Sequence, residues 1–197
     1  MATSALMTQL EAVNIILESI EEAPVASLAV SGLRPLEKAK AALVEASRLV
    51  QSPGWKFNTE RDYPLVRDID GEIPLAPNVL SVDVNPEFTE VDPVQRGLRL
   101  YDAKNRSYSF PRDLKAAVVF LLEWDELPQA ARHYITLKAA RTTQGRTPVG
   151  DSTYRYTEAD ETHALLAFSD QESTTGDHNM LRDSWSVASI LQYRRDY

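Results

Sequence analysis

Three acidic residues surround a tryptophan beyond the middle of the chain. Glu123, Asp125 and Glu126 flank Trp124. When an apolar neighbour raises the pKa of one carboxyl and another carboxyl stays ionised, the two can act as the acid and base of a glycosidase. The cluster therefore leaves glycoside hydrolysis open. Asp125 is also interpreted as a helix N-cap, and a chain with 29 acidic residues produces such clusters by chance.

Two further segments resemble ligand-binding loops, but neither has the complete motif. Gly145 and Gly150 are spaced as in a phosphate loop, yet Asp151 stands where that motif requires lysine. A carboxylate there repels phosphate, so we interpret the segment as a loop between helices. The run Asp68 to Glu72 lacks the twelve-residue register of a calcium loop, and its Asp-Gly pair is typical of a hairpin turn.

The sequence contains no pattern that supports metal, thiol or serine chemistry. His133, His163 and His178 are not spaced as helical metal ligands, and cysteine is absent. No serine lies in a nucleophile-elbow motif. We expect no catalytic residue, no metal and no cofactor.

The charge and hydropathy of the chain limit its partners. The 197 residues carry a net charge of −8, whereas nucleic-acid binding needs clustered Lys and Arg to displace counterions. The first apolar stretch has no basic residue before it, and the longest strongly apolar run is Ala116 to Leu122. We therefore expect no export signal, no membrane insertion and a soluble protein made in a cytoplasm.

Hydrophobic periodicity predicts two helices before the first cluster of prolines. Thr8 and Glu11 form a capping box, which starts a helix that ends before Pro24. A second helix is predicted from Pro35 to about Gln51, where Ser-Pro-Gly stops it.

The central part of the chain reads as strands and loops, because seven of the 11 prolines lie between residues 53 and 111. Trp55 and Phe57 are predicted to enter a half-buried strand. Further strands are predicted at 79–84, at 98–101 with 108–110 around a polar turn, and at 117–124.

Two helices are predicted after this region. Asp125 is expected to cap a helix that runs to Thr142, and a loop begins at Gln144. A fourth helix over 152–171 is expected to bury Tyr156, Ala159, His163 and Leu166.

The predicted fold class is therefore α+β, a mainly α-helical bundle of about four helices with a central antiparallel β-rich insertion. Residues 1–52 and 125–180 are expected to form a discontinuous helical body around the insertion at 53–124. Residues 181–197 have too few apolar neighbours to form a core and are expected to dock elsewhere. Three aromatic residues are expected to anchor the core: Trp55, Phe57 and Tyr134.

Several segments together resemble a known family. They are Ala12 to Leu17 with Pro24-Val25, Gln51 to Asn58 with its Trp-x-Phe-Asn, Arg96-Gly97 to Asp102, Leu127 to Arg141, and Asn179 to Leu181. In this order they are similar to tail tubular protein A of short-tailed bacteriophages, over most of the chain. Glu21 stands where that family usually has glycine, so we expect an extra helical turn in place of a left-handed residue.

The resemblance implies a structural virion protein of a podovirus tail, without enzymatic activity. It implies a dodecameric adaptor ring, the head-tail connector, between the portal protein and the nozzle protein, tail tubular protein B, with a tail fibre or tailspike attached nearby. DNA would pass through the ring without sequence-specific binding during ejection. The alternative is a glycoside hydrolase carried on the tail, which degrades envelope polysaccharide with the three acids described above.

The C-terminal segment is the expected portal-docking site. It contains aromatic, aliphatic and arginine side chains, which commonly anchor interfaces. They are Trp185, Ile190, Tyr193, Arg194 and Arg195. The other interpretations of this segment are that it folds back on its own subunit or that it is disordered.

Overall fold

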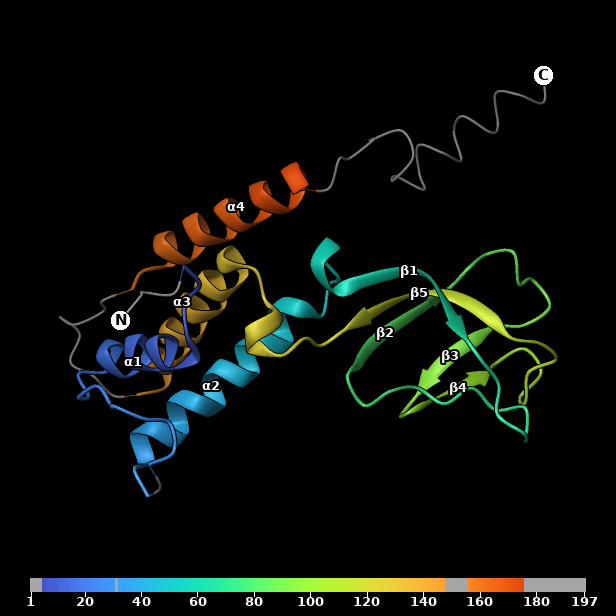
Figure 1. The fold of residues 1–197 in the computed structure, drawn as a ribbon, viewed down its shortest axis with the longest axis horizontal. Coiled ribbons are helices and arrows are strands. Elements are labelled where there is room, and N and C mark those ends of the chain that lie inside the picture. The colour runs from blue at the N-terminus through green and yellow to red at the C-terminus, as the bar shows by residue number, and fades with distance from the viewer. Residues whose placement is uncertain (1–4, 31, 148–155, 176–197) are drawn as a thin grey trace.

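The structure is a computed structural model that describes residues 5–30, 32–147 and 156–175. The described chain is elongated, with its helices at one end and its strands at the other (Figure 1). We call the four helices the helical body and the chain between α2 and α3 the β-rich insertion. This arrangement confirms the predicted α+β class with about four helices and an antiparallel β region.

Helix α1 (Gln9–Ser19) begins at the predicted capping box. Thr8 Oγ1 accepts from the Glu11 backbone N–H at 3.2 Å, and the Glu11 carboxylate accepts from the Thr8 backbone N–H at 2.7 Å. At the other end, the Glu22 N–H donates to the Leu17 carbonyl, while Glu21 has a φ of 61°. The expected extra turn is therefore wrong. Glu21 takes the left-handed conformation that closes a Schellman motif, because the bonds to the last turn require it.

Helix α2 (Arg34–Gln51) closely matches its prediction, with Pro35 in the first turn. Its buried face carries Leu36, Ala39, Leu43, Ala46 and Val50. The residues that follow are a correction. Trp55 and Phe57 do not enter a strand, because a 3₁₀ turn over Lys56–Asn58 comes first.

A three-stranded antiparallel sheet with the order β1-β5-β2 forms most of the β-rich insertion. Its strands are β1 (Thr59–Leu65), β2 (Val79–Val84) and β5 (Leu114–Phe120). β2 has the predicted bounds, whereas β5 ends before Trp124, which lies in a second 3₁₀ turn. β1 contains Pro64, which an edge strand tolerates because its unpaired side needs no N–H donor.

The second sheet is a hairpin of β3 (Pro93–Arg96) and β4 (Arg99–Asp102). The predicted pairing of 98–101 with 108–110 is wrong, because Gly97, with a φ of 63°, provides a tight turn that pairs β4 with the preceding segment. Asp102 is fully buried. Its Oδ1 accepts from the backbone N–H groups of Asp92, Lys104 and Asn105, and its Oδ2 from Asn105 Nδ2 at 2.6 Å.

Helix α3 (Gln129–Arg146) begins later and ends later than predicted. Pro128 occupies the N-cap position, so Asp125 does not cap this helix. Gly145 lies within the last turn rather than in a loop, because the N–H groups of that turn continue the helical pattern up to Thr147. The expected start of a loop at Gln144 is therefore wrong.

Helix α4 (Glu158–Thr175) begins at Thr157, whose hydroxyl and backbone N–H both bond the Asp160 carboxylate. The expected buried face is wrong. Leu166 is 61% exposed and His163 is exposed, whereas Ala164 and Phe168 are buried. Of the expected residues, Tyr156 is partly buried against the core, but the rest of the packed face is Ala164, Leu165 and Phe168. This face has few apolar residues, so periodicity alone did not identify it.

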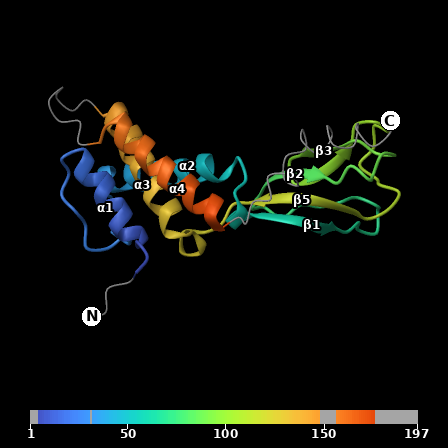
Figure 2. The same ribbon diagram turned by 90° about the horizontal axis from the view of Figure 1, so that it is seen from above.

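Helix α3 lies at the centre of the helical body, and α1, α2 and α4 all pack against it. In Figure 1, α4 lies above α3 and α2 lies below it, and Figure 2, seen from above, again places the helices at one end and the strands at the other. The buried apolar residues of the body and of the β-rich insertion form two separate clusters. The molecule therefore has two cores, joined by the segments on either side of the sheet.

Candidate interaction surfaces

The chain passes between the helical body and the β-rich insertion twice, and Gln51 joins the two passages. This side chain is fully buried at the end of α2. Its Oε1 accepts from the Leu122 N–H at 2.8 Å, and its Nε2 donates to the Leu122 carbonyl at 3.2 Å. The amide thereby pairs with the returning chain as a neighbouring strand would.

Asn58 adds a second link at the same place. Its Nδ2 donates to the Gln51 and Phe120 carbonyls at 3.0 and 2.8 Å, and its Oδ1 accepts from the Trp55 N–H at 2.7 Å. Gly54, with a φ of 80°, lies so close that a Cβ there would be 2.9 Å from a Val119 methyl. We call Gln51, Gly54, Asn58 and Leu122 the junction. It fixes the insertion to the body by hydrogen bonds between buried groups.

The three expected core anchors gather around a residue that sequence analysis missed. Phe168 of α4 is 1% exposed, with its ring centroid 4.4 Å from Trp55, 6.1 Å from Phe57 and 6.0 Å from Tyr134. Trp55 and Phe57 are half-buried, and Tyr134 is buried. Aromatic contacts thus join α4 to both α3 and the start of the insertion.

A charge cluster also holds α4 on α3. The Glu161 carboxylate accepts from Lys138 Nζ at 2.9 Å and from Arg141 Nε. Burial raises the pKa of Glu161, but the bonds from the two cations outweigh it, so the pKa lies below its ordinary value. Glu161 is therefore ionised in the folded protein at neutral pH.

The N-terminal segment is tied to α3 at Met7. Its N–H donates to Gln129 Oε1 at 2.7 Å, and its carbonyl accepts from Trp124 Nε1 and Arg132 Nη1. Arg132 is 3% exposed and also donates to the Leu127 and Asp125 carbonyls. The buried guanidinium thus joins the chain before α1 to the 3₁₀ turn before α3 through three main-chain carbonyls.

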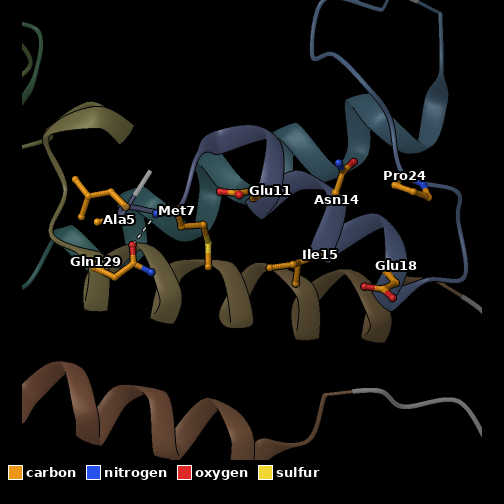
Figure 3. Close-up of a pocket in the computed structure, with 9 residues that line it drawn as sticks. Ala5, Met7, Glu11, Asn14, Ile15, Glu18, Pro24 and Gln129 are labelled. Atoms are coloured by element: carbon orange, nitrogen blue, oxygen red, sulfur yellow. Dashed lines mark hydrogen bonds between the residues drawn. The ribbon is translucent and has the colours of Figure 1, made fainter. Parts of the chain in front are cut away.

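A groove of about 620 Å³ runs beside α1 from this point (Figure 3). Figure 3 shows Met7 and Gln129 at one end, Pro24 at the other, and Glu11 and Glu18 on the intervening helix. The remaining lining is mostly apolar, including Leu6 and Ile15. The groove is large enough to receive side chains of another polypeptide.

The outer face of α2 is the second candidate surface. Val44 and Leu49 are 43% and 60% exposed there, and they line a hollow of about 650 Å³ together with Lys40 and Arg48. In the β-rich insertion, large apolar side chains are exposed on turns and strand ends. They are Val66, Ile69, Val94 and Leu98.

The acidic residues considered for catalysis have structural roles. Glu123, Asp125 and Glu126 are all exposed. Glu126 accepts from the Glu123 N–H at 3.1 Å, which closes the 3₁₀ turn, and the Asp125 carbonyl accepts from Arg132. These contacts explain the cluster as a turn between β5 and α3.

The other candidate residues are distributed as follows. Asp68 accepts from the Asp70 and Glu72 backbone N–H groups, as in an Asx turn. His133 and His163 are exposed on different helices, and no group of three metal-ligating side chains forms within the described ranges. The proposed docking residues Trp185, Ile190, Tyr193, Arg194 and Arg195, together with His178 and residues 148–150 of the expected loop, lie outside the described residues.

A family model described as tail tubular protein matches residues 10–178, which include the junction, the groove residues from α1 onward and the outer face of α2. The match covers far more than half of the 197 residues. The chain belongs to the tail tubular protein family. No curated protein matches the sequence closely enough to serve as a relative.

Membership makes the chain a structural protein of a bacteriophage tail, and therefore a component of the virion tail. The resemblance drawn from the sequence is confirmed at this level. None of the helices in the described ranges combines the length and the apolar character needed to cross a bilayer. The surfaces described above are accordingly candidates for contacts within a tail assembly.

Proposed function

We propose that this tail tubular protein is the adaptor of a short tail, joining the portal protein to the nozzle protein, tail tubular protein B. The observation that carries the proposal is the family match across both the helical body and the β-rich insertion. An elongated molecule with two separate cores and a bonded junction can contact one partner through each end. Tail fibres or tailspikes attach where the adaptor meets these two proteins.

Twelve copies form a ring in the host cytoplasm, and DNA passes through its channel. Each copy contributes a net charge of −8. Acidic walls repel the phosphate backbone, so passing DNA is not retained and no base sequence is read. The chain acts by its shape, without catalysis, cofactor or membrane insertion.

Within each copy, residues 1–52 and 125–180 act as the body and residues 53–124 as the insertion. Residues 181–197 dock on the portal. Deleting residues 182–197 is expected to abolish portal binding in a pull-down while circular dichroism stays unchanged, apart from the lost segment. Unchanged portal binding would remove the segment from the mechanism.

Electron microscopy of the purified chain mixed with its portal protein tests the proposal. We expect a ring of twelve copies stacked coaxially on the portal, and the same chain in isolated virions by mass spectrometry. A chain that stays monomeric with the portal and is missing from virions would refute the adaptor role.

A further inference from the structure

The outer faces of α2 and α4 differ in charge. Helix α2 has four basic and two acidic residues, and both acids already face cations: Glu37 bonds Lys40, and Glu45 bonds Arg146. Lys38 and Arg48 are exposed on this helix, as are the apolar side chains Val44 and Leu49. The free charge of this face is positive.

Helix α4 has five acidic residues and no Lys or Arg. Glu161 faces α3, and Glu172 accepts from the Lys56 backbone N–H, whereas Glu158 and Asp170 are exposed. Leu166 is 61% exposed between them. This face is therefore negative, with an apolar residue near its middle, and complements the outer face of α2.

The two faces cannot meet within one molecule, because α2 and α4 pack on opposite sides of α3 (Figure 1). Each helix has 18 residues and is about 27 Å long, so each outer face offers several helical turns to a neighbouring copy. A molecule with complementary surfaces on opposite sides binds further copies head to tail, and such contacts generate a ring when the rotation closes.

We propose that the outer face of α2 in one copy binds the outer face of α4 in the next copy, with Leu49 against Leu166, Lys38 facing Glu158 and Arg48 facing Asp170. This inference rests on the proposed ring. A symmetric contact, α2 to α2 or α4 to α4, would place like charges together and is disfavoured.

The chain has no cysteine, so engineered cysteines report this contact without background. We expect the L49C/L166C double variant, treated with a short bismaleimide, to give a ladder of covalent oligomers on a denaturing gel. L49C alone and L166C alone are the matched controls and are expected to remain monomeric, with at least tenfold less cross-linked product. Cross-linked dimers from either single variant at the level of the double variant would overturn the proposal.

Charge reversal gives an independent test with a rescue. K38E/R48E and E158K/D170K are each expected to abolish rings in electron microscopy, and combining the four substitutions is expected to restore them. Circular dichroism checks that each variant keeps its helices. Wild-type-like rings from K38E/R48E or from E158K/D170K would overturn this inference. Rings in which L49C/L166C fails to cross-link would also overturn it. Both results would leave the adaptor role unaffected. Wild-type protein that forms no ring with its portal would overturn the adaptor role itself.

Discussion

Glu21 holds a backbone conformation that costs a non-glycine residue about 1–2 kcal/mol. We expect Glu21→Gly to raise the free energy of unfolding by about 0.5–1 kcal/mol, because the relief exceeds the added entropy of the unfolded chain. Urea denaturation measures the change. Glu22→Gly is the control. It should lower stability, because Glu22 does not have a positive φ and glycine there only adds entropy to the unfolded chain. A loss of stability in Glu21→Gly would contradict this account.

Phe168 is the side chain on which the position of α4 depends. Phe168→Ala is expected to lower the free energy of unfolding by about 3–5 kcal/mol, because the residue is fully buried between three aromatic rings. Limited proteolysis should then cut α4 earlier than in the wild type. Leu166→Ala on the exposed face is the control, with a change within about 0.5 kcal/mol. Equal effects of the two substitutions would contradict the packing described here.

Sequence patterns identified individual residues where local chemistry decides their role. The Thr8–Glu11 box follows from two side chains three residues apart, so it was predictable. Phe168 was not, because α4 buries few apolar residues and its acids lie on several sides. Its burial is decided by Trp55 and Tyr134, which are distant in sequence. The amide contacts of Gln51 and Asn58 depend on tertiary structure in the same way.

At the level of elements, the junction is held by one amide side chain from each side. We expect Asn58→Ala to lower stability by about 2–4 kcal/mol, since two carbonyls and the Trp55 N–H lose a buried partner. Thermal unfolding measures the loss. Asn85→Ala, which removes an exposed bond to Asp62, is the control with little change. A similar small change in Asn58→Ala would argue that the junction is not fixed by this side chain.

Asp102 makes the β3-β4 hairpin sensitive to acid. Burial raises the pKa of its carboxyl, but the bonds from Asp92, Asn105 and Lys104 outweigh this, so the pKa lies below its ordinary value. A folded-state pKa below the unfolded one stabilises the protein above about pH 4, and the gain is lost as the pH falls through the folded-state pKa.

Asp102→Asn is accordingly expected to cost about 1–3 kcal/mol at pH 7, because an amide N–H₂ faces backbone donors. The difference from wild type should shrink as the pH falls below about 4, as followed by urea denaturation at several pH values. Asp83→Asn, at an exposed position of β2, is the matched control. A pH-independent difference would contradict the role assigned to the carboxylate.

Helices α1 and α2 and strand β2 were predictable because each has caps or alternation within its own residues. The pairing of β4 was not, because the choice between β3 and residues 108–110 depends on Gly97 and on the buried Asp102. The start of α3 was also predicted too early. Asp125, which was expected to cap this helix, instead lies in the 3₁₀ turn over Trp124–Glu126.

At the scale of the whole molecule, the presence of two separate cores leads us to expect that the helical body folds without the insertion. Thr59 pairs directly with Val119, so the ends of the insertion lie side by side. Replacing residues 60–118 by Asn-Gly, which favours a tight hairpin turn, should leave a chain with cooperative helical unfolding by circular dichroism. A control that replaces the same residues by Pro-Pro should fold less well. Loss of helical signal in the Asn-Gly chain would show that the body depends on the insertion.

The order of the chain also has a mechanical consequence. Central strand β5 leads through residues 121–128 into central helix α3, against which the other helices pack. A force applied to the sheet therefore reaches the middle of the bundle along one covalent path, with Gln51 bracing that path at Leu122. Load applied to one end of the molecule would therefore be transmitted along its long axis to the other end (Figure 1).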